Sequence, residues 1–190
     1  NHVGKEKIIW RYDPILLSEK YNIEYHKKYY DYLANSLSDY TSKCIISFLD
    51  FYNKIEKSLS NQNINQITHK EMLTIAEIIS NIAQKYNLKV ESCCEDIDLS
   101  QLNITKSHCI DGDLINRITG KKYDFQKDKN QRKTCGCISS IDIGLYNTCQ
   151  HNCIYCYANQ SHSVVLKNYD PASPLLCSEL QPTDIVTDRK

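Results

Sequence analysis

Three cysteines near the C-terminal end of the sequence, Cys149, Cys153 and Cys156, have the spacing C-x3-C-x2-C. Three thiolates from one short loop can bind three irons of a cube-shaped [4Fe–4S] cluster and leave the fourth iron open to another ligand. A structural zinc site normally has four protein ligands. The spacing therefore predicts a [4Fe–4S] cluster on these residues. The alternative is a zinc site, whose fourth ligand would come from Cys135, Cys137 or His151.

Four further cysteines stand where a second metal site is expected. Cys135 and Cys137 flank a glycine that allows a tight turn. Cys93 comes just after an expected strand and Cys109 just before an expected helix, where functional residues of parallel sheets gather. We therefore expect Cys93, Cys109, Cys135 and Cys137 to hold a second iron–sulfur cluster or a zinc ion. The alternative is that Cys93 and Cys109 are small buried residues, as free cysteines commonly are.

The cysteine content also bears on the cellular compartment. There are ten cysteines in 190 residues, and eight of them fall between residues 93 and 156. Disulfide-bonded secreted domains are short, whereas this sequence contains long helical patterns. We therefore expect reduced, metal-bound cysteines and a cytoplasmic protein.

Arg11 and Asp13 are the candidate catalytic residues outside the cysteines. The apolar run Lys7–Tyr12 predicts a buried strand that ends in a loop at Asp13-Pro14. The carboxyl ends of parallel strands are where α/β proteins bind their ligands. Arg11 could bind a carboxylate or phosphate through its planar guanidinium, and Asp13 could act as a base. The alternative is a structural Arg–Asp ion pair.

Strand and helix patterns alternate along the chain. A capping box at Thr68 and Glu71 opens the clearest helix, because each side chain satisfies a backbone N–H of the first turn. The expected helices are 24–37, 68–86 and 111–119, and the expected strands are 7–12, 44–51, 88–92 and 140–145.

This order is typical of a parallel α/β fold. Four strands are too few to close an eight-stranded barrel, so we expect a partial or permuted (β/α) barrel-like domain. Residues 1–134 would form the barrel-like region and residues 135–190 the cysteine-rich cluster region of the same domain. The sequence lacks a starting Met and enters a strand within a few residues, which favours a C-terminal fragment of a longer chain.

The charge balance argues against a strongly basic or membrane-bound class. Lysine plus arginine and aspartate plus glutamate both number 23, so no net charge attracts nucleic acid or anionic lipid. No apolar run approaches the roughly 20 residues that cross a bilayer. The short basic run Lys127–Lys133 is interpreted as a solvated loop, with nucleic-acid contact as the alternative.

The cysteine loop resembles the cluster motif of radical S-adenosylmethionine enzymes. The string from Tyr146 to Asn159, YNTCQHNCIYCYAN, is similar to the spore photoproduct lyase-like branch of that family. The resemblance implies that S-adenosylmethionine chelates the open iron and is cleaved reductively to a 5′-deoxyadenosyl radical. It implies that Tyr155 contacts the adenine, and that a flavodoxin or ferredoxin donates the electron.

A second resemblance extends over nearly the whole chain. It is to the uncharacterised bacterial family "domain of unknown function 1848", which is thought to share the radical-enzyme cluster at its C-terminal end. The segments that carry it are Trp10–Pro14, Ile46–Phe51, Lys127–Lys133, Cys135–Cys137 and Asp170–Leu176. Ordinary radical enzymes have the cysteine loop near the N-terminus, whereas here only residues 157–190 follow it, which is why a permuted barrel is considered.

These observations predict an iron–sulfur protein of the radical S-adenosylmethionine type that acts on an unknown small-molecule or nucleic-acid substrate. One alternative is a metal-binding or electron-transfer protein without radical chemistry. Another is a zinc-stabilised, nucleic-acid-associated protein of a repair-like kind.

Overall fold

The computed structural model describes residues 3–159, 161, 163–165, 170–175 and 177–187. The chain divides into two compact units. Unit 1 comprises Asn1–Phe51 and Gln62–Ser140, and unit 2 comprises Tyr52–Asn61 and Ile141–Lys190. Within the described ranges, no helix combines the length and the apolar composition that crossing a membrane requires.

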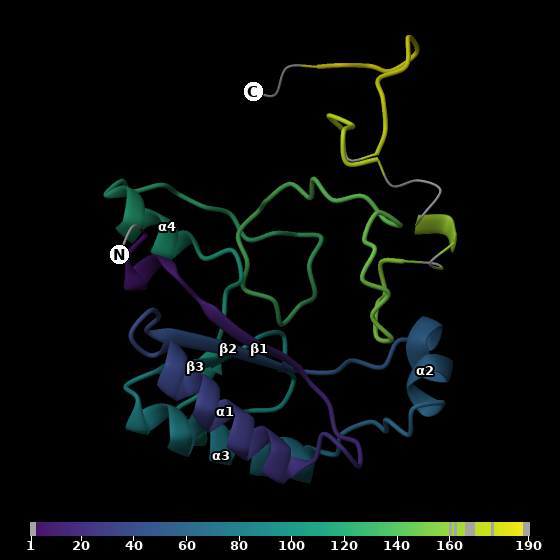
Figure 1. Cartoon of the computed structure of the whole chain (residues 1–190). Helices are drawn as coiled ribbons and strands as arrows, with labels where there is room; N and C mark the ends of the chain where they lie inside the picture. Colours follow the sequence, from purple (N-terminus) through teal and green to yellow (C-terminus); the bar gives the residue numbers. More distant parts are fainter. Residues whose placement is uncertain (1–2, 160, 162, 166–169, 176, 188–190) are drawn as a thin grey trace. The chain divides into compact units, whose positions relative to one another are not determined.

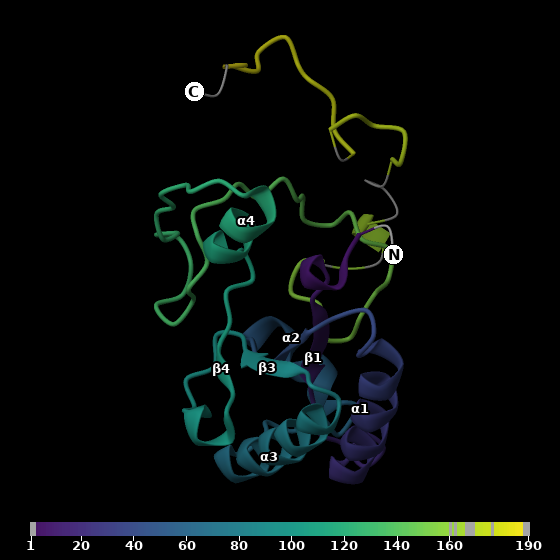
Figure 2. The ribbon, with the colours of Figure 1, turned by 90° about the vertical axis from the view of Figure 1, so that its left-hand side faces the viewer.

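Unit 1 is built on a parallel sheet of four strands in the order β1-β2-β3-β4 (Figures 1 and 2). The strands are β1 (Trp10–Ile15), β2 (Lys43–Phe48), β3 (Lys89–Ser92) and β4 (Thr105–Lys106). Consecutive parallel neighbours are also the winding of a (β/α) barrel, but this sheet is not closed. The predicted α/β class with parallel strands is confirmed.

Two long helices cover one face of the sheet (Figure 1): α1 (Ile23–Leu37) and α3 (His69–Lys85). The side chain of Asn22 accepts a hydrogen bond from the backbone N–H of Tyr25 and caps α1. The predicted capping box of α3 is present, since Thr68 and Glu71 each accept the other's backbone N–H. Both helices therefore begin where local side-chain chemistry satisfies their first N–H groups.

The core lies between this sheet face and the two helices. Alternate strand residues point into it, among them Trp10 on β1 and Ile46 on β2. The ring of Trp10 stacks on the buried Tyr30 of α1, with ring centroids 4.8 Å apart. Each large side chain buried here contributes about 1.5–3 kcal/mol. Arg11 lies in register with Ile45, which is in register with Glu91, so these three residues point to the opposite face.

The opposite face is covered by residues 107–139, including the short helix α4 (Gly112–Thr119) (Figure 2). Asp111 caps α4 by accepting two backbone N–H bonds, and Gly120 ends it with a φ of 66°. A left-handed residue at this position favours glycine, which confirms the predicted helix and its stop. Two 3-10 turns, η1 (Lys5–Lys7) and η2 (Ser100–Leu102), complete unit 1.

Two strand predictions were wrong. Residues 140–145 form no strand, and Ile143 is 83% exposed; their alternating pattern has no neighbouring strand to pair with. The fourth strand is β4 instead. The first strand does not end at Asp13-Pro14 but continues to Ile15. β1 is an edge strand, where a residue without an N–H is tolerated, and its register shifts between Tyr12 and Ile15.

Unit 2 contains the helix α2 (Asn53–Ser60), which the sequence analysis did not predict, followed after a long interval by the cysteine loop. Ile55 and Leu59 are its buried residues. The two lie one helical turn apart, a spacing too brief to stand out in so polar a segment.

Candidate metal-binding sites

Two cysteines meet at the carboxyl edge of the sheet in unit 1. Cys93 directly follows β3 and Cys109 comes three residues after β4, and their Sγ atoms are 3.1 Å apart. Backbone hydrogen bonds fix the approach, from Cys93 N–H to the Ile46 carbonyl and from Ser107 N–H to the Ser92 carbonyl. The predicted convergence of Cys93 and Cys109 is therefore present in the structure.

Arg11 connects these thiols to Asp13. Its Nη1 donates to Cys109 Sγ at 3.1 Å, and its Nε donates to Asp13 Oδ2 at 3.0 Å. Asp13 also accepts a hydrogen bond from Ser47 Oγ at 3.3 Å. Arg11 and Asp13 thus form the ion pair that was the structural alternative, and the pair holds a guanidinium against sulfur.

These contacts shift the pKa values of the two thiols in opposite directions. The hydrogen bond with Cys109 lowers the pKa of Cys93 to about 5; burial opposes this shift and Arg11 reinforces it. The same hydrogen bond and burial raise the pKa of Cys109 above its ordinary value. Of the two thiols, Cys93 is therefore the one whose deprotonated form is favoured, and Arg11 faces the pair.

Cys135 and Cys137 join the same group of thiols. Both are buried, each 6% exposed. The backbone N–H of Ile110 donates to Cys137 Sγ at 3.4 Å. Gly136 between them lies close to the exposed His108, since a Cβ there would lie 2.3 Å from Cδ2 of His108 and that side chain would have to move.

Cys94, which the sequence analysis did not select, connects the two pairs. Its thiol interacts electrostatically with those of Cys93 and Cys135, and burial and the charge on Cys93 raise its pKa to about 12. Its φ of 57° is in the left-handed region. Adjacent residues of an extended chain point to opposite sides, so this turn is what lets Cys94 and Cys93 face the same group. The described residues include no set of three or more His, Cys, Asp or Glu side chains already arranged to hold a metal ion.

An acidic side chain closes the same edge of the sheet. Glu95 Oε1 accepts the backbone N–H of Phe48 at 2.8 Å, and burial raises the pKa of Glu95 to about 7. Asp50, just after β2, forms an ion pair with Arg132 at 2.7 Å. Acidic residues therefore follow both central strands, as expected of a polar edge.

The cysteine loop of unit 2 is closed at its base by one backbone hydrogen bond and one from the side chain of Asn159. Asn147 N–H donates to the Ala158 carbonyl at 3.2 Å, and Asn159 Nδ2 donates to the Cys149 carbonyl at 2.6 Å. Cys156 N–H donates to the Cys153 carbonyl at 3.0 Å, a tight turn between two of the candidate ligands. The loop presents its thiols outward, since Cys149 and Cys153 are exposed and Cys156 is half-buried.

A hollow of about 280 Å³ lies beside this loop within unit 2. Cys153 and Cys156 line it together with polar residues of the loop and of α2 and with two isoleucines, Ile55 and Ile154. Lys54 of α2 lines it too and donates to the Tyr157 carbonyl at 2.8 Å. Tyr155, the expected adenine contact, is 36% exposed. The hollow is somewhat smaller than the roughly 300 Å³ at which small-molecule pockets begin, so it suits an inorganic cluster better than a whole nucleoside cofactor.

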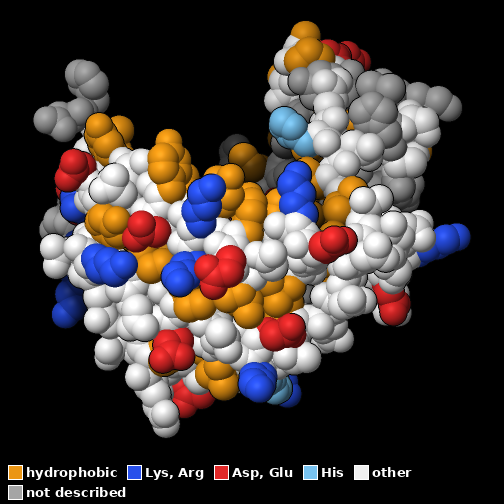
Figure 3. All heavy atoms as spheres, turned by 60° about the horizontal axis from the view of Figure 1, so that its bottom comes forward, with side chains coloured by type: hydrophobic (Ala, Val, Ile, Leu, Met, Phe, Trp, Pro, Cys, Tyr) orange, Lys and Arg blue, Asp and Glu red, His pale blue; other side chains and the backbone are white. Residues whose placement is uncertain are grey.

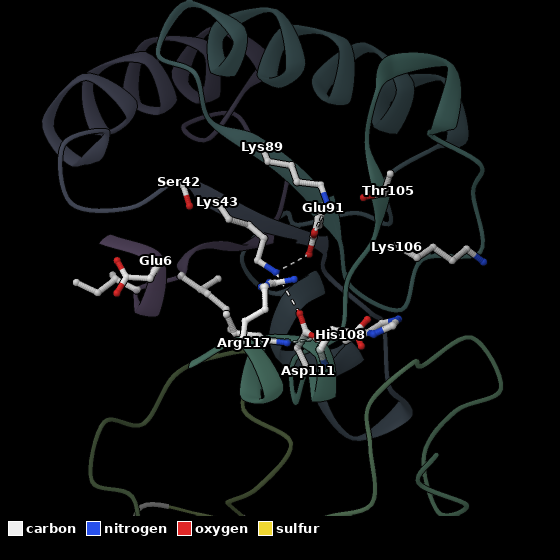
Figure 4. A pocket seen from close by; sticks show the side chains of 14 residues that line it. Glu6, Ser42, Lys43, Lys89, Glu91, Thr105, Lys106, His108, Asp111 and Arg117 are labelled. Carbon is white, nitrogen blue, oxygen red and sulfur yellow. Dashed lines mark hydrogen bonds and ion pairs between the residues drawn. The ribbon is translucent and has the colours of Figure 1, made fainter. Parts of the chain in front are cut away.

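A larger cavity of about 450 Å³ lies at the opposite, amino edge of the sheet (Figure 4). Four of its charged side chains are paired with one another: Lys43 Nζ lies 3.0 Å from Glu91 and 3.7 Å from Asp111, and Lys89 lies 2.8 Å from Glu91. Lys106 points away from this network in Figure 4. Because the cavity is charge-balanced and lies away from the carboxyl edge, we interpret it as structural.

The fold and the two cysteine groups define an α/β protein with an open parallel sheet and two candidate thiolate sites. Comparison with protein families matches residues 1–158 to the family described as "Domain of unknown function (DUF1848)". The chain belongs to this family, and the match includes all the cysteines discussed above. No curated protein and no solved structure matched the chain.

Proposed function

We propose that this is an iron–sulfur protein of the radical S-adenosylmethionine type, with a [4Fe–4S] cluster on Cys149, Cys153 and Cys156. The observation that carries the proposal is the closed loop that presents three thiols, two of them exposed and one half-buried. Three thiolates satisfy three irons and leave one iron for an exogenous chelating ligand. When bound, the cluster supplies the electron for reductive cleavage of S-adenosylmethionine.

The residues around the loop have definable roles in this proposal. The hydrogen bonds from Asn147 and Asn159 hold the loop in its closed form, which keeps the three cysteines within one short loop. Lys54 adds a positive charge beside the hollow, where it offsets part of the negative charge of three thiolates. Tyr155 remains the proposed adenine contact, since half-exposed aromatic rings are suited to stacking.

A protein that binds the cluster without radical chemistry is the second candidate. The small size of the hollow and the exposure of Cys149 and Cys153 favour it, because an accessible cluster exchanges electrons readily and a radical enzyme must also enclose its cofactor. A nucleic-acid function has less support: on the outer face of α1 and α3, basic and acidic side chains are interspersed (Figure 3).

Anaerobic reconstitution with iron and sulfide tests the cluster. The wild type is expected to bind about four more irons per chain than the Cys149→Ala/Cys153→Ala/Cys156→Ala variant, with a matching loss of visible absorption. Cys177→Ala, a cysteine of the same unit outside the motif, is the control and keeps the iron. Equal iron in the triple variant and the wild type refutes the site.

The radical step is tested separately. With dithionite and S-adenosylmethionine, the reconstituted wild type is expected to release 5′-deoxyadenosine and the triple variant is not. A fully loaded cluster that releases none supports the electron-transfer candidate instead.

A further inference from the structure

We propose that unit 1 has a metal centre of its own, in which Cys93, Cys109, Cys135 and Cys137 bind a thiophilic metal, either zinc or iron. This site is independent of the cluster in unit 2. It goes beyond the proposed function, because it would hold the segment 107–139 on the sheet whether or not the cluster loop is occupied.

The first argument is the convergence of thiols from three separate parts of the chain. The Sγ atoms of Cys93 and Cys109 are 3.1 Å apart. The thiol of Cys94 interacts electrostatically with those of Cys93 and Cys135, and the thiol of Cys137 interacts with that of Cys135. Cysteines that merely fill a core have no reason to gather in this way, because a thiol packs equally well against any apolar neighbour. Sulfur gathers on sulfur where a soft metal is to be bound.

The second argument is what the segment 107–139 lacks. Its buried residues are Ser107, Gly112, Asp128, Cys135 and Cys137. No buried aliphatic or aromatic side chain is among them, and α4 is the segment's only helix in the described residues. A segment of this length without an apolar core usually needs a disulfide or a metal to stay in place. Its cysteines are free, so no disulfide holds it. A metal would therefore add to the ion pairs that Asp111 and Arg132 of this segment make with Lys43 and Asp50.

The third argument is the set of donors that already face the sulfurs. Arg11 donates to Cys109, and the backbone N–H of Ile110 donates to Cys137. Hydrogen bonds of this kind stabilise metal-bound thiolates and tune their charge. A four-thiolate zinc site carries a net charge of about −2, which Arg11 partly offsets.

The five sulfurs follow one another in a line and are not arranged around a common centre. Metal binding therefore requires some of these side chains to rotate. Cys93 and Cys109 form one end of this line and Cys135 and Cys137 the other. Cys94 lies between them, next to Cys93 in sequence and with the same side-chain chemistry.

Metal content is the direct test, measured on chains in which Cys149, Cys153 and Cys156 are alanine, so that the site of unit 2 contributes nothing. We expect about one zinc per chain, or iron with sulfide, after anaerobic purification. Adding Cys135→Ala/Cys137→Ala is expected to lower this at least about tenfold, whereas adding Cys177→Ala, a cysteine outside both groups, keeps it. Elemental analysis of the bound metal shows whether the site takes zinc or iron. If the triple-alanine variant contains no metal, the proposal is wrong.

A second measurement protects the test against a variant that fails to fold. In the wild-type chain, Co²⁺ is expected to produce a thiolate-to-cobalt charge-transfer band. Removal of metal by a chelator is expected to speed trypsin cleavage within residues 121–133 by about tenfold or more, because that segment loses its staple. Unchanged cleavage, no cobalt band, or a Cys93–Cys109 disulfide in the purified protein would each contradict a metal centre.

Discussion

Replacing Glu91 with glutamine leaves the ammonium of Lys43 inside unit 1 with one carboxylate where it had two. The Lys43 side chain is 14% exposed and that of Glu91 is 8% exposed, and their charged atoms are 3.0 Å apart. Asp111 remains as a partner, but at 3.7 Å. The substitution keeps the size of the side chain, so the main change is the loss of one buried negative charge.

The expected loss of unfolding free energy depends on the partner that Lys43 retains. Removing one partner of a fully buried ion pair costs about 3–5 kcal/mol. Asp111 retains part of that interaction, which reduces the cost. Lys89 also loses Glu91, but its side chain is 59% exposed, and an exposed pair contributes at most about 1 kcal/mol. We therefore expect Glu91→Gln to lower the free energy of unfolding by about 2–3 kcal/mol.

Urea unfolding followed by tryptophan fluorescence reports on the unfolding of unit 1, which contains Glu91. Trp10 is the single tryptophan of the chain and lies in the core of unit 1. Lys89→Gln is the control, since it leaves both buried charges in place, and we expect it to cost less than about 1 kcal/mol. If Glu91→Gln shifts the unfolding free energy by less than about 0.5 kcal/mol, the cavity in Figure 4 does not depend on its ion pairs and our structural interpretation of it fails.

Three further predictions concern the elements that position the sites. Thr68→Ala is expected to cost about 1 kcal/mol in urea unfolding by removing the cap of α3, while Thr74→Ala on the same helix costs under about 0.5 kcal/mol; equal effects would count against the capping box. Burial lowers the pKa of His26, so the unfolded chain binds a proton first and stability is expected to fall as pH drops below about 6.5; an unchanged pH slope in His26→Gln would contradict this. Gly112→Ala places a Cβ 2.7 Å from Cδ2 of Phe125 and is expected to cost about 1–3 kcal/mol, part of which Phe125→Ala restores; a neutral Gly112→Ala would mean that the ring moves freely.

Local patterns were enough to predict much of the fold. The capping box at Thr68, the helical periodicity behind it, and the Asp111 and Gly120 ends of α4 are all decided within a few residues of sequence. The strands were less predictable, because a strand exists only where another strand pairs with it. Residues 140–145 have the right alternation and no partner, whereas β4 has only two residues and is defined by its pairing with β3.

Contacts of the candidate site in unit 1 were predictable only in part. That Cys93 and Cys109 meet follows from the rule that functional residues gather at the carboxyl edge of a parallel sheet. That Arg11 reaches Cys109, 98 residues away, depends on the register of four strands, which no local pattern specifies. Cys94 was missed in the sequence analysis because its orientation depends on its backbone conformation. Its left-handed φ turns its side chain toward the other thiols of unit 1, and no local pattern indicates that φ.

The two cysteine groups differ in what holds their thiols together, and this difference should appear in their behaviour on unfolding. Cys149, Cys153 and Cys156 belong to one loop closed by nearby hydrogen bonds, so their separations depend little on the sheet. The thiols of unit 1 come from the ends of β3 and β4 and from a loop beyond α4, so they are brought together only when the sheet forms. A metal in unit 1 should therefore be released together with the tryptophan transition, because its ligands separate as the strands do. A cluster in unit 2 has no such dependence, and its release should follow the stability of its own loop.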